Sequence, residues 1–441
     1  MNENNKNVLL LVTHNKKKII NLKEGLIKLI NSAKKNIYLS TWLLNLKDVK
    51  DALLKKASEL KGHIYCLMAI EQNNFRYKLS PAYKNSLEAD IDETQERFNF
   101  KCLKELSGSN SSGAAIEIRG HSNCHAKFLV IDEEKMLITS ANFTHASLEI
   151  GPNPILNRNE IGLLICDSYL VRELTCLFKD IYLLRYNAHY PFKGPEKDEF
   201  YPVVYSKQIL HNNNDYLSEL IDSNMRPSNG LELIWTYDIL NEKEYPKGFE
   251  PKKFLKALEE IIKIENQFIF ITAFSIVDLE DTLSDLLIKK IQDQKVKTVI
   301  IIDTKNKDRV PEKLKKLTEL DNFDIFYHPG THAKFVLTSK NWLMATANID
   351  GTHGLRNSFE VGILGGVSEI YAIFKDFFIE LLSECPNSQE CLLKIKTMNQ
   401  LTCKLCGSKF NTKNGLNHHL NSFHHQTKTK QSLNLHIKAK H

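Results

Sequence analysis

The stretch HAKFLVIDEEKMLITSAN, residues 125–142, occurs a second time as HAKFVLTSKNWLMATAN, residues 332–348. In each copy His-Ala-Lys-Phe opens an apolar run, and a small hydroxyl residue, Ala and Asn close the segment. A Glu before another apolar run follows (NEIGLLI and FEVGIL), and then a stretch that carries FKD. One ordered pattern present twice indicates a chain built from two similar halves.

The segments around each copy predict the fold class. The expected elements are a helix over 23–36 with strands over 37–41 and 63–70, and a helix over 253–267 with strands over 268–272 and 296–303. Strands that alternate with helices at this spacing are typical of an α/β fold with mainly parallel sheets. We expect the halves to pack about a pseudo-twofold axis, which brings the two His-Ala-Lys segments together.

The chain divides into six predicted parts. They are a first half (1–190), a connector (191–230), a second half (231–385), a linker (386–400), a finger (401–425) and a basic tail (426–441). An insertion over 71–115 has no counterpart in the second half. Such an insertion beside a strand end is either a lid over a site or a surface excursion without chemical function, and both readings stay open.

The two His-Lys pairs carry the chemistry. His125 and Lys127 stand two positions apart, as do His332 and Lys334. On a strand such positions face the same side, so each pair is expected to point into one cavity. An imidazole supplies a nucleophile or a proton donor, while an ammonium group and the Asn amide hold non-bridging oxygens. The pattern therefore predicts phosphodiester chemistry.

The pattern His-x-Lys-x4-Asp-x6-x-Ser-x-Asn resembles the HKD motif of the phospholipase D superfamily, whose lipases, lipid synthases and nucleases share a fold with two such motifs. The resemblance implies that one His attacks phosphorus to form a phosphohistidine, while the other protonates the leaving oxygen and then activates water. Which His attacks stays open, with a slight preference for His125. The active-site residues implied are His125, Lys127, Asn142, Glu160, His332, Lys334, Asn348 and Glu360.

The resemblance also implies roles for the other members of this set. The Lys and Asn side chains would bind phosphate oxygens, and Glu160 and Glu360 would accept a hydrogen bond from the far imidazole nitrogen and fix its tautomer. The second copy departs from the pattern, because Ser339 stands where Asp132 stands in the first. In the family this Asp mainly supports local structure, so His332 is still expected to contribute. No catalytic metal is expected.

The C-terminal part predicts a zinc finger. Two Cys and two His have the spacing C-x2-C-x12-H-x4-H, which resembles the Cys-Cys-His-His fingers. Phe410 and Leu416 occupy the core positions of such a finger. Four ligands leave no open position, so the Zn2+ is expected to be structural. The predicted ligands are Cys403, Cys406, His419 and His424, with His425 as an alternative fourth ligand.

The finger is expected to tether nucleic acid or to contact a protein. Gly415 stands at a base-reading position and has no side chain to read a base, which disfavours sequence-specific recognition. The candidate nucleic-acid contacts are Lys404, Lys409, Lys413 and His418. A further pair, His436 and His441, lacks a Cys pair and is not expected to bind zinc independently.

The charge distribution bears on the substrate. The tail from residue 401 contains seven Lys and no acidic residue, so the first 400 residues sum to about −1 (6 minus 7). Attraction to nucleic acid is therefore expected mainly in the tail. We predict a nuclease that cleaves DNA or RNA; the alternatives are a phospholipase D-type lipid phosphodiesterase and a non-catalytic nucleic-acid-binding module. The mostly polar insertion does not favour a lipid entrance.

The expected setting follows from what the sequence lacks. The N-terminal apolar run is too short for a secretory signal, and no stretch has the apolar length of a membrane helix. We expect a cytoplasmic protein, or a nuclear one in a eukaryote, with no membrane partner. Nucleases of this kind often act in host-defence or DNA-processing assemblies, and the near-neutral body indicates a protein partner such as a helicase or ATPase.

Overall fold

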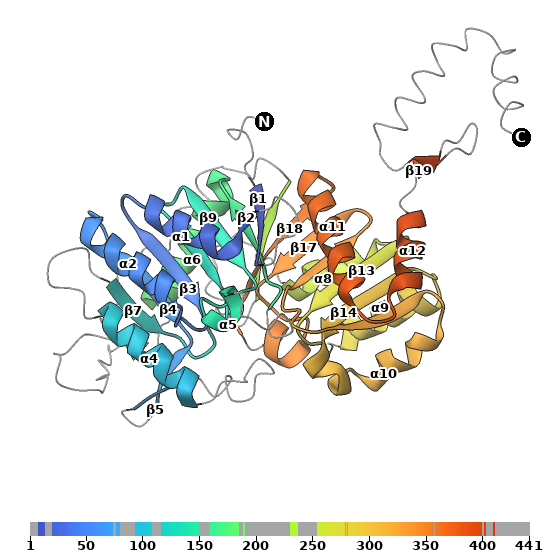
Figure 1. The fold of residues 1–441 in the computed structure, drawn as a ribbon, viewed down its shortest axis with the longest axis horizontal. Helices are drawn as coiled ribbons and strands as arrows, with labels where there is room; N and C mark the ends of the chain where they lie inside the picture. The colour runs from blue at the N-terminus through green and yellow to red at the C-terminus, as the bar shows by residue number, and fades with distance from the viewer. Residues whose placement is uncertain are drawn as a thin grey trace, which may run out of the picture. The chain divides into compact units, whose positions relative to one another are not determined.

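A computed structural model describes the chain over residues 8–13, 20–73, 76–79, 93–107, 116–149, 158–184, 188–189, 230–236, 254–277, 279, 281–356, 358–398, 401–402 and 409–410. These residues form a mixed α/β structure with two large sheets, as predicted (Figure 1). No helix within these ranges combines the length and the apolar character needed to cross a bilayer. The predicted connector 191–230 lies almost wholly outside them.

The first sheet has nine strands within the described residues, in the order β11-β7-β4-β3-β8-β9-β10-β1-β2. Its strands are β1 Val8–Val12, β2 Ile20–Asn21, β3 Ile37–Thr41, β4 Ile64–Met68, β7 Ile116–Gly120, β8 Phe128–Ile131, β9 Lys135–Thr139, β10 Ile161–Ile165 and β11 Ala188–His189. The helices of this half are α1 Leu22–Ser32, α2 Lys47–Glu59, α4 Glu93–Ser107, α5 His145–Leu148 and α6 Ser168–Leu184.

The second sheet repeats the arrangement with seven strands in the described ranges, in the order β12-β18-β17-β16-β13-β14-β15. The strands are β12 Glu232–Trp235, β13 Phe268–Ala273, β14 Lys297–Asp303, β15 Phe323–His328, β16 Phe335–Thr338, β17 Asn341–Ala345 and β18 Val361–Gly366. The helical elements are α8 Phe254–Lys263, α9 Asp281–Gln292, η5 Thr304–Arg309, α10 Glu312–Lys315, η6 Lys316–Glu319, η7 Gly351–Arg356 and α11 Glu369–Glu384.

Both sheets are mixed, so the prediction of mainly parallel sheets is wrong. Among the described strands, parallel pairing is confined to β3-β4-β7, to β13-β14-β15 and to the short pair β1-β2. The strands that follow each His-Ala-Lys segment, β8-β9-β10 and β16-β17-β18, pair antiparallel. Strands joined by a tight turn, such as β8 and β9, can pair only in this way.

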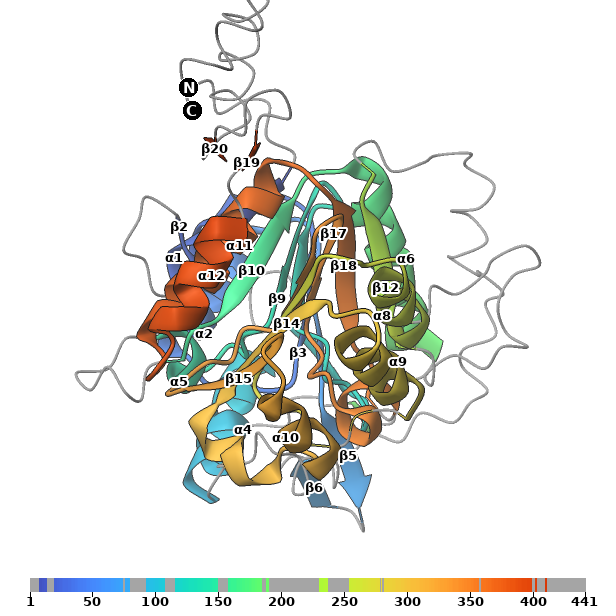
Figure 2. The ribbon, with the colours of Figure 1, turned by 90° about the vertical axis from the view of Figure 1, so that its right-hand side faces the viewer.

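Helices cover the sheets on both sides. Figure 2 shows α1, α2 and α11 on one side of the strands and α6, α8 and α9 on the other. Successive strand residues face opposite sides. Leu39 therefore packs into the core beneath α1 and α2, whereas the ring of its neighbour Tyr38 lies 5.6 Å from that of Phe178 in α6.

The repeated HAKF and FKD motifs meet in the structure. Phe128, which follows Lys127, packs against Phe178 of the first FKD, with ring centroids 6.0 Å apart. Phe335 packs against Phe374 of the second FKD at 5.4 Å. The aromatic residue of each FKD thus anchors the closing helix of its half on the strand that follows the His-Lys pair.

The insertion 71–115 contains a β-hairpin and a packed helix. The hairpin consists of β5 (Ile70–Asn73) and β6 (Arg76–Leu79). In α4, Leu103 and Leu106 join the hydrophobic core, and Asn99 Oδ1 accepts a hydrogen bond of 2.8 Å from the backbone N–H of Leu44. This part of the insertion is therefore a buried element of the first half.

The chain divides into two units, Met1–Leu381 and Leu382–His441. The predicted linker 386–400 contains helix α12 (Gln389–Met398). Two short strands, β19 (Leu401–Thr402) and β20 (Lys409–Phe410), pair antiparallel. The predicted zinc ligands lie outside the described residues.

In each half a carboxylate links the turn after the His-Lys strand to the loop before the first inner strand, but the carboxylate comes from a different position in each half. Asp132 accepts hydrogen bonds from the backbone N–H groups of Lys34, Lys35 and Asn36, at 2.7–2.9 Å. In the second half Ser339 occupies the equivalent position, and its N–H and hydroxyl donate to Glu265. The prediction that this Asp has a structural role agrees with these contacts.

Glu265 takes over the function of the missing aspartate. Its Oε1 accepts the backbone N–H groups of Asn266 and Gln267, while Oε2 accepts that of Ser339 at 2.7 Å. Burial alone would raise the pKa of Glu265, but the N–H groups, above all that of Gln267, and the Ser339 hydroxyl hold the pKa below its ordinary value. The carboxylate is therefore ionised at neutral pH.

Replacement of Glu265 by Ala should lower the free energy of unfolding by about 3 kcal/mol at pH 7, because it leaves several backbone donors without an acceptor. The depressed pKa means that this stabilisation is present above the unfolded-state pKa of about 4.3 and is lost as the pH falls through the folded-state pKa. Urea unfolding followed by Trp fluorescence measures the difference. The control, Glu260→Ala on the exposed face of α8, should change stability by less than about 0.5 kcal/mol. An equal effect of both variants would contradict this account.

Candidate active site

The two His-Ala-Lys segments lie immediately before β8 and β16 and not within those strands, which corrects the prediction that they are on strands. The backbone N–H of each histidine donates to the opposite half. The N–H of His125 donates to the carbonyl of Phe359 at 3.1 Å, and that of His332 donates to the carbonyl of Asn159 at 3.0 Å. Bridges between Cys124 and Phe359, and between Asn159 and Thr331, complete this symmetric junction.

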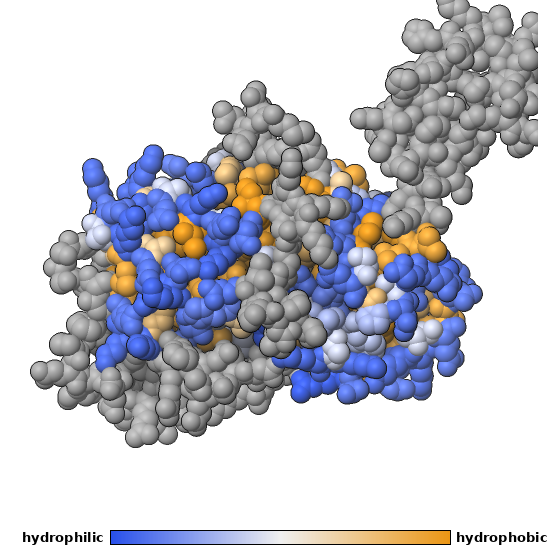
Figure 3. Space-filling view, in the orientation of Figure 1, coloured by the Kyte–Doolittle hydropathy of each residue, from blue (hydrophilic) through white to orange (hydrophobic). Residues whose placement is uncertain are grey.

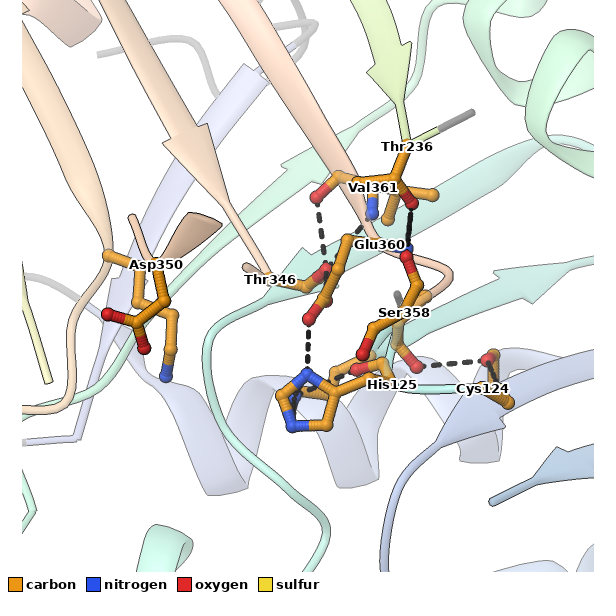
Figure 4. A network of polar contacts seen from close by, with 12 residues as sticks. Cys124, His125, Thr236, Thr346, Asp350, Ser358, Glu360 and Val361 are labelled. Carbon is orange, nitrogen blue, oxygen red and sulfur yellow. Dashed lines mark hydrogen bonds and ion pairs between the residues drawn. The ribbon is translucent and has the colours of Figure 1, made fainter. Parts of the chain in front are cut away.

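Each imidazole pairs with the glutamate of the other half. Nδ1 of His125 lies in hydrogen-bond contact with Oε1 of Glu360, as Figure 4 shows. Nδ1 of His332 lies 2.7 Å from Oε1 of Glu160. A carboxylate bound at Nδ1 fixes the tautomer and leaves Nε2 as the nitrogen available for chemistry. The predicted glutamates are therefore both in place, and the pairing is crosswise.

The hydroxyl residues of the SAN and TAN segments orient these carboxylates. Ser140 Oγ donates to Oε2 of Glu160 at 2.6 Å, and Thr346 Oγ1 donates to Oε2 of Glu360 at 2.5 Å. Each glutamate thus uses one oxygen for the imidazole of the other half and one for the hydroxyl of its own half. This explains why a hydroxyl residue stands two positions before the Asn in both copies.

Two threonines that the sequence analysis missed hold the glutamate backbones. Thr13 Oγ1 accepts the N–H of Glu160, and Thr236 Oγ1 accepts the N–H of Glu360, both at 2.9 Å. They follow β1 and β12, which are the strands paired with β10 and β18. Each threonine directly follows an apolar strand, β1 or β12. This signal becomes visible in the sequence only when the segments around β1 and β12 are aligned with each other.

Charged groups are concentrated in a buried space. Lys127, Lys334, Glu160, Glu360 and His332 are fully buried. Burial raises the pKa of Glu160, but the adjacent His332 imidazole, with Lys334 and the Ser140 hydroxyl, outweighs this effect and holds the pKa below its ordinary value. Isolated buried charges are strongly unfavourable, so the alternation of ammonium, imidazole and carboxylate is what allows these groups to coexist.

The lysines lie beside the histidines of their own half. Lys127 Nζ donates to the carbonyl of His125 at 2.8 Å and lies 3.1 Å from its Nε2. Lys334 Nζ lies 3.3 Å from Nε2 of His332. The prediction that each His and Lys point to the same side is therefore confirmed, and positive charge is located next to each Nε2.

An aromatic ring packs against each histidine, and neither ring was predicted. Trp42 lies edge-on to His125 with centroids 4.9 Å apart, and Phe274 lies at the same distance from His332. Both follow directly after an inner strand of their sheet, β3 or β13. Each ring restricts the orientation of its imidazole and excludes water from the face of the imidazole that it contacts.

The asparagines Asn142 and Asn348 are buried at the ends of the segments after β9 and β17. Cys124 is also buried, and its thiol contacts Ser40 Oγ. Burial raises the pKa of Cys124 to about 12, so the thiol is protonated and unreactive at neutral pH.

One further aspartate positions the His332 segment. Asp303, the last residue of β14, accepts the N–H of Gly330 at 3.0 Å through Oδ2. The carbonyl of Gly330 accepts the N–H of Asn159, whose own carbonyl accepts the N–H of His332. Burial raises the pKa of Asp303. The position that corresponds to Asp303 in the first half is Ala69, so this support exists on one side only.

The predicted finger residues are not tested by this geometry. Cys403, Cys406, His419, His424, Lys404, Lys413 and His418 lie outside the described residues, and Lys409 is described only as part of β20. Within the described residues, no group of three or more His, Cys, Asp or Glu side chains has an arrangement suited to a metal ion.

The arrangement suits attack on a phosphodiester. Two imidazoles with fixed tautomers provide one group for nucleophilic attack and one for proton transfer. Two buried ammonium groups beside them are suited to stabilise the negative charge of non-bridging oxygens. The crosswise pairs require both halves, so each chain contains a complete set.

Comparisons with known proteins bear on the family of the first half and on the fold. The model of a family described as "Cardiolipin synthase, PLD-like domain" matches residues 26–182. A search of curated proteins finds no match. Among solved structures, the phosphatidylserine synthase of Haemophilus influenzae Rd KW20 superimposes with a TM-score of 0.56 at 14% identity, over 89% of this chain and 93% of that one.

Two other solved structures superimpose with lower TM-scores. Polyphosphate kinase from Porphyromonas gingivalis gives a TM-score of 0.48 at 12% identity over 85% of this chain, which spans 50% of the kinase. NucT from Helicobacter pylori gives 0.28 at 15% identity, over 35% of this chain and 98% of that one. The family match shows a PLD-like domain over residues 26–182, and the superposition with the synthase shows a similar fold over most of both chains.

Proposed function

We propose that the protein is a metal-independent phosphodiesterase that cleaves nucleic acid, DNA or RNA, through a phosphohistidine intermediate. The observation that carries this proposal is the crossed pairing of two His-Lys motifs with two buried glutamates. It provides a nucleophile, a proton donor and positive charge in one buried site, which are the requirements of a two-step displacement at phosphorus.

In the proposed first step, Nε2 of His125 attacks phosphorus and the bond to the leaving oxygen breaks. His332 donates the proton that this oxygen takes up. In the second step His332 removes a proton from water, whose oxygen attacks phosphorus and breaks the P–N bond. Lys127 and Lys334 stabilise the charge on the non-bridging oxygens, with the amides of Asn142 and Asn348 as further ligands.

We assign the attacking role to His125. Its side chain keeps 13% of its surface exposed, whereas that of His332 is fully buried. A substrate phosphate that enters the site therefore meets His125 first. The fully buried His332, paired with a glutamate of depressed pKa, is better suited to hold a proton until the leaving oxygen needs it.

The choice of a nucleic-acid substrate rests on the C-terminal part of the sequence. The Cys-Cys-His-His spacing and the seven Lys from residue 401 onward favour a polyanionic partner. The other candidate is a lipid phosphodiester, because the matching family description and the superimposed synthase both name lipid enzymes. We further propose that the finger holds a structural Zn2+ and that a protein partner such as a helicase or ATPase delivers the substrate in a cytoplasmic or nuclear assembly.

Wild-type protein should cut labelled DNA or RNA in excess EDTA, and His125→Ala and His332→Ala should each reduce the rate by about 10³-fold or more, because each removes a chemical step. Gel analysis of the products measures both effects and identifies the polymer. The nuclease proposal would be abandoned if the wild type cut neither polymer but released headgroups from phospholipids. Full activity in either His variant would contradict the shared site.

The glutamate variants Glu160→Gln and Glu360→Gln should separate the roles of the histidines. The wild-type pH profile should be bell-shaped, since one imidazole acts neutral and the other charged. Each variant removes the negative charge that favours the protonated form of one imidazole. Glu160→Gln should therefore move the alkaline limb to lower pH if His332 is the acid, and Glu360→Gln should move the acidic limb to lower pH if His125 is the nucleophile. The opposite pattern would exchange the two roles.

The double variant Cys403→Ser/Cys406→Ser should lose one bound Zn2+ per chain, because only two ligands remain. Metal content after gel filtration measures this loss. The same variant should bind nucleic acid more weakly while it cleaves a small phosphodiester at the wild-type rate. Undiminished affinity for nucleic acid would instead assign the finger to a protein contact.

A further inference from the structure

We propose that the segment Thr304–Glu319, named here the basic segment, binds the phosphate backbone of the substrate beyond the phosphate that reacts. This inference rests on the proposed function and specifies where a nucleic-acid strand lies on the catalytic body. It also departs from the sequence-based expectation that electrostatic attraction is located mainly in the tail.

The basic segment is a local concentration of positive charge in a near-neutral body. It contains six basic and three acidic residues, a net charge of +3 over sixteen positions. Its basic side chains that face solvent are Lys305, Lys307, Arg309, Lys313 and Lys316. Asn306, Val310, Leu314 and Leu317 are buried beneath them, so the charged side is fixed outward by packing.

Two contacts place the start of this segment beside the active site. Asp303 accepts the N–H of Lys305 at 2.8 Å through one carboxylate oxygen and the N–H of Gly330, two residues before His332, through the other. Independently, Lys307 Nζ lies 5.4 Å from the centre of the Tyr327 ring, at the end of β15 that leads into the His332 loop. One residue, Asp303, therefore contacts both the start of the basic segment and the loop that carries His332.

The segment belongs to the second half only. It follows β14, and in the first half the connection from β4 to β7 is made instead by the insertion that carries β5, β6 and α4. The two sides of the site are thus different, which gives a bound strand a direction. Figure 3 shows hydrophilic residues over the part of the surface where Figure 1 places α10.

The surface chemistry favours a dissolved polyanion over a membrane. The large apolar side chains that are exposed among the described residues are Ile20, Ile264, Val367 and Leu393, and none of them belongs to the basic segment. Membrane-surface binding combines basic residues with apolar side chains that enter the lipid. Basic side chains alone, spaced along a surface, are suited to the regularly spaced phosphates of a nucleic acid.

The test compares two triple variants of the full-length chain that each remove three positive charges. The first is Lys307→Gln, Arg309→Gln and Lys313→Gln; Lys305 is kept because its charge acts on Asp303. The matched control is Lys263→Gln, Lys289→Gln and Lys295→Asn, at exposed positions where the chain enters β13 and β14, at the opposite end of the strands from Asp303. Asn suits position 295, whose φ is +54°.

Binding to a labelled oligonucleotide is measured in EDTA at a series of salt concentrations. The first variant should reduce the slope of log K against log salt by about 2–3, and the control by less than about 1, since each lost phosphate contact reduces the slope by about 1. In cleavage, kcat/KM for the oligonucleotide relative to that for bis(p-nitrophenyl) phosphate should fall by about tenfold or more in the first variant only.

Equal slopes in the two triple variants would overturn the inference, whether or not the wild type cleaves the oligonucleotide. Loss of binding to anionic phospholipid vesicles, with oligonucleotide binding retained, would overturn it in favour of a membrane surface. If the wild type binds but does not cut, the proposed function fails while the slope comparison still decides the inference. Circular dichroism and the small phosphodiester substrate show that both variants are folded.

Discussion

The carboxylates of Glu160 and Glu360 are fully buried, and each lies against an imidazole from the opposite half. Removing one partner from a buried ion pair typically costs about 3–5 kcal/mol, so the two halves are joined by the same contacts that form the active site. The backbone bridges at Cys124 and at Asn159 set the register in which these pairs meet. Catalysis and assembly of the halves therefore depend on one set of contacts.

The symmetry is close at the centre and is lost around it. Both histidines have the same kinds of neighbours: a glutamate, a lysine and an aromatic ring. Outside this set, Asp303 supports only the His332 loop, and the basic segment lies only on that side. The turn held by Asp132 is held by Glu265 in the second half. At both turns the fold requires a carboxylate that accepts hydrogen bonds from backbone N–H groups. Asp132 supplies it in the first half and Glu265 in the second.

Much of the site could be predicted from the sequence because its spacings are local. The His and Lys of each motif, and the glutamate before the next strand, stand in a fixed order in both copies. Thr13, Thr236, Trp42 and Phe274 were missed because each acts on a residue far away in the chain. The His-Ala-Lys segments were wrongly placed on strands, since the backbone N–H of each histidine donates to a carbonyl of the other half. The prediction of mainly parallel sheets failed because tight turns after each motif force antiparallel pairing.

The sequence by itself determined the residue types of the site and the presence of two equivalent halves, because one ordered pattern with short spacings occurs twice. Only the tertiary structure decided which glutamate serves which histidine. His125 and Glu360 are 235 positions apart, whereas Glu160 of its own half is much closer in sequence. Two similar halves allow pairing within a half or across halves with the same residues. The packing of the halves about their junction selects the crosswise pairing.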